Sequence, residues 1–238
     1  QAILHLLHHL RCYPTQGTKF YKNWRDAPVY KMLTNDLGHK IDDGTLLWFT
    51  DASHGDCDES RSTGCYIGLF QGGVVDANCF VAQPVPHSTA ESETIALSYG
   101  ATACSYVRMG IADLLFNDPS RPWTIPMMSD SQAAIAMNSS ERPSKRSRHI
   151  DRRFFYARTQ FLAAWLSFHH VDADHSLADV GTKNLPAEES CYKISILEYP
   201  VSDHAIGSKA LQASSKVVKD DEESPKVAKA YDKSIDRK

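Results

Sequence analysis

The alternation of apolar and polar stretches between residues 45 and 82 predicts three β-strands. The run at 46–49 is apolar and lies between polar turn residues, which is typical of a buried strand; this first strand is expected at 45–52. Two further strands are expected at 64–70 and 74–81, with Gly72 and Gly73 as a hairpin signal between them. Because the connections are short, the pattern predicts an antiparallel meander.

A long helix is expected next, because Pro84 and Pro86 end the strand pattern and Ser88 or Thr89 can cap a helix that runs to about residue 116. Steps of three and four residues from Glu93 meet a continuous apolar stripe. The same steps from Glu91 meet a more polar face. We therefore expect Glu93 to face the sheet and Glu91 to face away from it.

The remaining pattern alternates strands and helices. Strands are expected at 124–130 and 165–171, a short helix at 131–137, a helical stretch from 149 to 162, and a final helix that starts at 175 and ends before 184. Because a long helix separates the first and fourth strands, these two should pair in parallel. The sequence predicts an α/β fold: a five-stranded mixed sheet, three antiparallel strands and then two parallel ones, flanked by helices.

The two ends of the chain carry weaker patterns. Residues 2–10 fit an amphipathic helix, and residues 194–197 could form a short strand or a helix. Residues 214–238 mix both charge signs with few large apolar groups, so we expect disorder there. There is no run of 18 apolar residues, and no membrane span is expected.

Four carboxylates stand out by their position. Asp51 and Asp130 each lie at the end of an expected apolar strand, whereas Glu93 and Asp179 lie on expected helices. A charge at the end of a buried strand is costly unless something neutralises it, and parallel neighbours end at the same rim of a sheet. Oxygen ligands suit Mg²⁺, and two such ions can catalyse phosphodiester hydrolysis. We therefore expect these four acids to hold divalent metal ions.

Charge and cysteine content refine this interpretation. The net charge of −3 gives no global sign of nucleic-acid binding, but residues 141–158 are strongly basic. Their cations suit phosphate binding, with a solvated helix face as the alternative. They are Arg142, Lys145, Arg146, Arg148, Arg152, Arg153 and Arg158. The six cysteines are scattered, which favours free thiols in a reducing compartment over a zinc site or disulfides.

Six groups of motifs lie around the four acids along residues 50–185: TDA at 50–52, RSTGCY at 61–66, STAESE at 88–93 with IALS at 95–98, SDSQAAI at 129–135, SRHID at 147–151 with Arg153, and LAD at 177–179 followed by TKNL at 182–185. In these motifs and in their order, the chain resembles the ribonuclease H domain of copia-type LTR retrotransposon polyproteins. Residues 1–24 are similar, more weakly, to the end of the preceding reverse transcriptase region. Ser131 stands where the family usually has Asn, and Phe155 where many members have His.

The resemblance implies a ribonuclease H-like fold that hydrolyses the RNA strand of an RNA–DNA hybrid with two Mg²⁺ or Mn²⁺ ions. It also implies an upstream reverse transcriptase domain as a partner and an intracellular location, in cytoplasmic virus-like particles or in the nucleus. The expected domains are a reverse transcriptase tail at 1–43, the nuclease at 44–186 and an extension at 187–238. The expected catalytic residues and metal ligands are Asp51, Glu93, Asp130 and Asp179, and the expected nucleic-acid contacts are Arg61, Lys145, Arg146, Arg148, Arg152 and Arg153.

Two histidines are auxiliary candidates. His149 and Asp151 would diverge at helical spacing, so a structural role suits His149 better than a catalytic dyad. His175 lies four residues before Asp179 and could relay protons, or it could simply be exposed. Two other functions stay open: a decayed remnant that binds hybrids or is only structural, and another nuclease or integrase of the same fold. Four ordered acids and the lack of a zinc-binding module favour the ribonuclease H.

Overall fold

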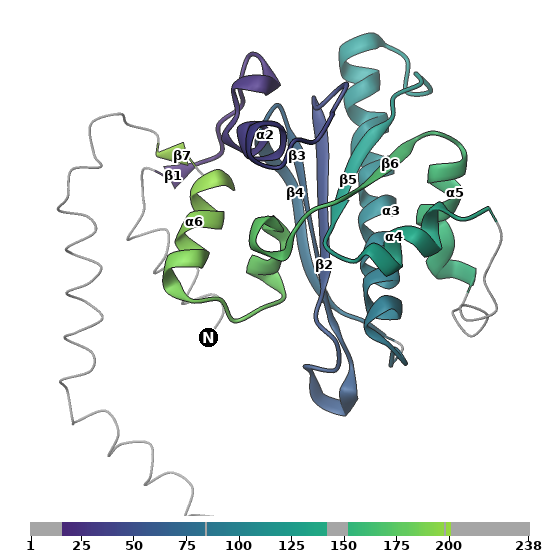
Figure 1. Cartoon of the computed structure of the whole chain (residues 1–238). Helices are drawn as coiled ribbons and strands as arrows, with labels where there is room; N and C mark the ends of the chain where they lie inside the picture. The colour runs from purple at the N-terminus through teal and green to yellow at the C-terminus, as the bar shows by residue number, and fades with distance from the viewer. Residues whose placement is uncertain (1–15, 84, 142–151, 198, 201–238) are drawn as a thin grey trace, which may run out of the picture. The chain divides into compact units, whose positions relative to one another are not determined.

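The computed structural model describes residues 16–83, 85–141, 152–197, 199 and 200 (Figure 1). The chain divides into two compact units, and the larger one, Thr18–Tyr199, contains the five-stranded sheet and all the helices described below. Two short strands, β1 (Gln16–Gly17) and β7 (Tyr199–Pro200), lie at the limits of the described chain. The helix expected at 2–10 and the disorder expected at 214–238 fall outside the described residues.

The centre of the larger unit is a five-stranded sheet of order β4-β3-β2-β5-β6. β2 pairs antiparallel with β3 and β3 with β4, whereas β5 runs parallel to both β2 and β6. This arrangement confirms the predicted fold class, with three antiparallel strands followed by two parallel ones. The strands are β2 (Leu46–Ala52), β3 (Thr63–Phe70), β4 (Gly73–Val81), β5 (Ile125–Ser129) and β6 (Leu166–His170).

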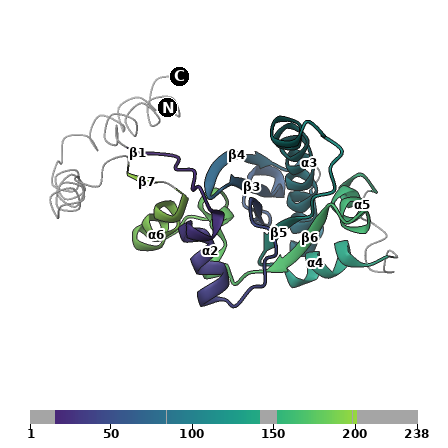
Figure 2. The ribbon, with the colours of Figure 1, turned by 90° about the horizontal axis from the view of Figure 1, so that it is seen from above.

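Helices cover both faces of this sheet (Figure 2). On one face lie α3 (Thr89–Phe116), α4 (Gln132–Ser139) and α5 (Tyr156–Leu162). On the other lie α2 (Pro28–Lys31), the 3₁₀ turn η7 (Leu177–Gly181) and α6 (Ala187–Leu197). Successive side chains of β2 point to opposite faces of the sheet. Trp48 packs in the α3 cluster, and Leu47 and Phe49 pack in the α2 cluster.

The segment before the sheet also contributes to the core. η1 (Trp24–Asp26), α2 and the π-helical turn η2 (Met32–Asp36) bring Tyr30 and Leu33 into the cluster that contains Phe49. The sequence pattern predicts no helix or strand in this segment. Its apolar residues are too few and too close together to show a helical period, so their burial depends on contacts with the distant sheet.

The start of α3 confirms one expectation and corrects another. Ser88 is the N-cap, and its Oγ accepts a hydrogen bond from the Glu91 amide at 3.2 Å. Glu91, however, is only 5% exposed rather than facing solvent. Its carboxylate accepts a hydrogen bond from the His87 amide at 2.8 Å, which closes the helix N-terminus. Residues 91–98 are all buried, so an amphipathic interpretation of this end of the helix was wrong.

Two local details also differ from expectation, and the structure decides between the strand and the helix that were both open at residues 194–197. The β3–β4 turn is formed by Gln71 and Gly72, both with positive φ, and Gly73 already begins β4. In place of a final helix from 175, two 3₁₀ turns, η6 (Ala173–His175) and η7, are separated by extended Ser176. Residues 194–197 form the end of α6. The remaining 3₁₀ turns are η3 (Asp58–Ser60) and η5 (Arg152–Phe155).

A search of the described helices finds none with the length and apolarity needed to cross a bilayer.

Two glycine substitutions should change stability in opposite directions. Gly68 of β3 lies opposite Trp48, and a Cβ at Gly68 would overlap the indole ring, so Gly68→Ala should destabilise the protein by about 1–3 kcal/mol. Gly110 of α3 has nothing within 4 Å of such a Cβ, so Gly110→Ala should stabilise it by up to about 1 kcal/mol. Thermal unfolding of both variants tests this. Equal shifts of the same sign would contradict the described packing of β2 on β3.

Candidate active site

Three aspartates from separate elements meet at one edge of the sheet. Asp51 is near the end of β2, Asp130 directly follows β5, and Asp179 lies in η7. One carboxylate oxygen from each lies within 4.8 Å of the other two. Because β2 and β5 are parallel neighbours, their C-terminal ends reach the same rim, as the sequence predicted. Asp51 and Asp179 are buried, and the Asp130 side chain is 19% exposed.

Glu93 reaches the same rim from α3. Its Oε1 accepts a hydrogen bond from the Ala52 amide at 3.2 Å, one residue after Asp51. Its Oε2 is buried and has no hydrogen-bond partner among the described residues. Glu93 is not one of the three acids whose oxygens lie within 4.8 Å of one another, so the structure groups three of the four predicted acids and places the fourth beside them.

A lysine lies between the three aspartates. The Nζ of Lys183 is 2.9 Å from Asp179 Oδ1, 3.4 Å from Asp51 Oδ1 and 3.5 Å from Asp130 Oδ2. The preceding residue, Thr182, donates a hydrogen bond from its hydroxyl to Asp51 Oδ2. The sequence analysis did not include either residue among the site residues. The available signal was the four-residue spacing of Asp179 and Lys183, which suits an ion pair across one turn of helix.

Burial sets the electrostatics of the site. It raises the pKa of Asp51 to about 6, helped by Asp179 and Asp130 and opposed by Thr182 and Lys183. Burial also raises the pKa of Glu93 to about 9, helped by the neighbouring Asp51 and Asp130 carboxylates. For Lys183, burial opposes the charge, but the Asp179 hydrogen bond and the surrounding carboxylates raise its pKa above the ordinary value. The rim therefore carries more acid groups than its cations neutralise.

This donor set suits a divalent cation that prefers oxygen. The three converging carboxylates and the unpartnered Glu93 Oε2 are hard ligands of the kind that Mg²⁺ and Mn²⁺ bind. A cation there would compete with the Lys183 ammonium for the same oxygens. It would also favour the ionised forms of Asp51 and Glu93, whose protonation burial otherwise promotes.

Most of the expected nucleic-acid contacts lie outside the structural description. This applies to Lys145, Arg146, Arg148 and the auxiliary His149, and to the side chains of Arg152 and Arg153, whose backbone starts η5. Arg61 is described and lies 3.8 Å from the Glu59 carboxylate, with its side chain 34% exposed.

Arg158 corrects the interpretation of the basic stretch. It is buried, and its Nε donates a hydrogen bond to the Met137 carbonyl at 3.2 Å. Its guanidinium lies over the ring of Phe155, 4.1 Å from the ring centroid. Arg158 therefore joins α4 to α5 and does not face phosphate. Phe155, at the position where many family members have His, belongs to the same packing contact.

Three further polar residues, two of them singled out from the sequence, differ in their local contacts. Ser131 caps α4, with its Oγ accepting the Ala134 amide at 3.2 Å, a role that Asn also performs well. His175 lies in η6, and its Nδ1 is buried without a hydrogen-bond partner in the described part of the chain, so a role in relaying protons stays a prediction. His170, which the sequence analysis did not select, lies with Nε2 3.1 Å from the Asp130 carbonyl oxygen.

Comparison with known proteins gives one sequence relative of note. The chain is 26% identical over 145 residues to the retrovirus-related Pol polyprotein from transposon TNT 1-94 of Nicotiana tabacum. The match covers 60% of this chain but only 11% of that polyprotein. No protein-family model matches the chain. The chain is thus similar to a small part of a retrotransposon Pol polyprotein.

Solved structures with some similarity include three ribonuclease H-containing or reverse transcriptase chains. The N-terminal RNase H domain of a Mycobacterium tuberculosis protein has 12% identity and a TM-score of 0.42, covering 63% of this chain and 96% of that one. RNase H1 from Halobacterium salinarum has 15% identity and a TM-score of 0.39, covering 62% and 97%. A foamy viral protease-reverse transcriptase in complex with RNA/DNA hybrid has 11% identity and a TM-score of 0.43, and the match covers 60% of this chain and 20% of that one.

Glu93→Gln should make the free energy of unfolding of the metal-free protein fall less as the pH rises. The folded-state pKa of Glu93, about 9, lies above its ordinary 4.5, so its contribution to stability is greatest below pH 4.5 and is lost as the pH rises toward 9. Gln is neutral throughout. Between pH 5 and 8 in EDTA, Glu93→Gln should gain on the order of 4 kcal/mol of unfolding free energy relative to the unsubstituted chain.

Denaturant unfolding at the two pH values measures this difference. Glu188→Gln, at an exposed position of α6, is the matched control and should follow the unsubstituted chain. A Glu93→Gln difference that is the same at both pH values would show that the Glu93 carboxyl is not held protonated by burial.

Proposed function

We propose that this chain is the ribonuclease H region of a copia-type LTR retrotransposon polyprotein, and that it hydrolyses the RNA strand of RNA–DNA hybrids. The observation that carries the proposal is the convergence of Asp51, Asp130 and Asp179 at one rim of the sheet, with Glu93 beside them. The ordered motifs around these acids and the similarity to a tobacco retrotransposon Pol polyprotein support it. Residues 44–186 are the proposed core of the nuclease, preceded by the end of a reverse transcriptase.

The proposed ligands of two Mg²⁺ or Mn²⁺ ions are Asp51, Glu93, Asp130 and Asp179. Bound ions would activate the attacking water and stabilise the leaving oxygen of the phosphodiester. The chain's own residues prepare this site. Thr182 orients Asp51 through its hydroxyl, and the Ala52 amide holds Oε1 of Glu93 so that Oε2 stays available. Lys183 keeps the three aspartates together when no other cation neutralises them.

Substrate selection would depend on duplex shape and 2′-hydroxyl groups rather than on base sequence. The proposed phosphate contacts are Arg61, Lys145, Arg146, Arg148, Arg152 and Arg153, so binding should weaken steeply with salt. The proposed partner is the reverse transcriptase domain that would precede residue 44. The proposed location is intracellular, in virus-like particles or the nucleus, as for elements of this type.

One observation favours a second candidate, a non-catalytic remnant that only binds hybrids. Lys183 already pairs with all three aspartates, so the acids are partly neutralised without a metal ion. A chain that no longer bound metal could keep the same ion pairs for stability alone.

Cleavage of a labelled RNA–DNA hybrid by the full chain separates these candidates. The unsubstituted chain should cut the RNA strand in Mg²⁺ or Mn²⁺ and stop in EDTA. Asp51→Asn should lower the rate at least about a hundredfold, because it removes a proposed ligand charge while keeping its shape. Asp113→Asn, at an exposed position of α3, is the matched control and should leave the rate unchanged.

Other outcomes point elsewhere. A folded chain that binds the hybrid without cutting it would favour the remnant. Cutting of duplex DNA with the hybrid spared would favour another nuclease of this fold.

A further inference from the structure

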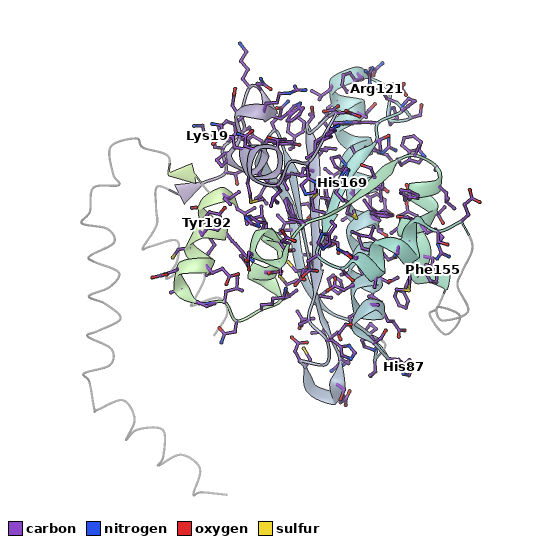
Figure 3. The ribbon with its side chains drawn as sticks, in the orientation of Figure 1. Lys19, His87, Arg121, Phe155, His169 and Tyr192 are labelled. Atoms are coloured by element: carbon purple, nitrogen blue, oxygen red, sulfur yellow. The ribbon has the colours of Figure 1, made fainter. Side chains whose placement is uncertain are left out.

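Lys193 is the most deeply buried cation in the described part of the chain. It lies on α6, after residue 186 where the sequence predicts that the nuclease domain ends, and its side chain is 0% exposed. Its neighbour Tyr192 lies on the outer side of the same helix and is 45% exposed (Figure 3). α6 therefore turns a lysine toward the interior of the protein, beside the apolar Ile196 and Leu197.

The ammonium group of Lys193 has three acceptors. It lies 2.8 Å from Asp179 Oδ2, 3.0 Å from Glu189 Oε1 and 2.9 Å from the Ala173 carbonyl oxygen. An ammonium has three N–H donors, so these contacts can satisfy it completely. They join three separate pieces of chain: η6, η7 and α6.

Asp179 is held from both sides as a result. Oδ2 faces Lys193, and Oδ1 faces Lys183 at 2.9 Å, next to Asp51 and Asp130. The element that carries Asp179 is a single 3₁₀ turn without a side-chain cap, which by itself gives little rigidity. The hydrogen bond from Lys193 sets which carboxylate oxygen turns toward the other acids.

Stability alone is a weak reason for burying this ion pair. A buried lysine and aspartate lose much hydration, and apolar residues of similar size commonly stabilise a protein equally well or better. Ligand orientation is a different matter, because groups that hydrogen-bond to metal ligands commonly change metal affinity by 10- to 100-fold.

We infer that Lys193 is a positioning residue that orients Asp179 for cation binding, so that α6 is part of the functional unit. The inference rests on the proposed metal site. Lys193 itself does not touch the proposed metal or the substrate; it acts through Asp179.

The direction in which cation affinity changes when Lys193 is replaced distinguishes a positioning role from a simple charge effect. Removing a nearby positive charge would by itself strengthen cation binding, because less repulsion remains. Loss of the Asp179 orientation would weaken cation binding. Lys193→Met removes the charge and the hydrogen bonds while keeping a similar apolar length, so the two explanations predict opposite results.

The test is calorimetric titration of the full chain with Mn²⁺, well below the thermal midpoint of each variant. Lys193→Met should bind Mn²⁺ about 10- to 100-fold more weakly than the unsubstituted chain. Glu188→Gln, an exposed change on the same helix, should bind it unchanged. Equal or tighter binding by a folded Lys193→Met would overturn the inference while leaving the proposed function intact. If the unsubstituted chain binds no Mn²⁺, both are overturned.

If Lys193→Met does not fold, the unsubstituted chain still gives a test. The side-chain ¹⁵Nζ signal of a buried, hydrogen-bonded lysine can be followed by NMR during titration with Mg²⁺. Positioning requires the Lys193 signal to shift with the same midpoint as cation binding, because its partner Asp179 becomes a ligand. A Lys193 signal that stays in place while Mg²⁺ binds would overturn the inference.

Discussion

The neutralisation of a buried carboxylate organises this protein. Asp51 is fully buried near the end of β2, where an uncompensated charge would be costly. The compensation comes from two residues that lie more than a hundred positions later, Thr182 and Lys183. Both follow η7, and η7 packs in the same apolar cluster as Leu47 and Phe49 of β2. The sheet, the 3₁₀ turn and the polar site are therefore parts of one arrangement.

The sheet was predictable because its signals are local. Each strand is a short apolar run between turn residues, and the order of strands and helices is enough to separate parallel from antiparallel pairs. Two of the three aspartates, Asp51 and Asp130, followed from the same logic, because they lie at the ends of parallel neighbours. Ser88 as a helix cap was predictable for the same reason: its hydrogen bond partner lies three residues away.

The parts that the sequence did not predict depend on contacts between distant residues. Nothing near Lys193 indicates that its partner is Asp179, and nothing near Tyr30 indicates that it packs beneath the sheet. Glu91 was assigned to the more polar face of its helix, away from the sheet, because periodicity describes one helix alone. Its burial depends on what surrounds that helix. The prediction of a final helix from residue 175, where the structure has 3₁₀ turns, was wrong for another reason. A short segment fits three and 3.6 residues per turn about equally well.

The long separation between paired residues also bears on how the chain folds. β2 pairs with β5, although β3, β4 and α3 lie between them in the sequence. Asp179 forms an ion pair with Lys193 of α6. Such non-local contacts require large loops to close before they return any stabilisation, and they slow folding. During synthesis, the carboxylates of Asp51 and Asp130 therefore leave the ribosome well before Lys183, with which both pair. The ion pairs of the site can form only after residue 183 has emerged, so the aspartates acquire their final arrangement late, when most of the larger unit has been made.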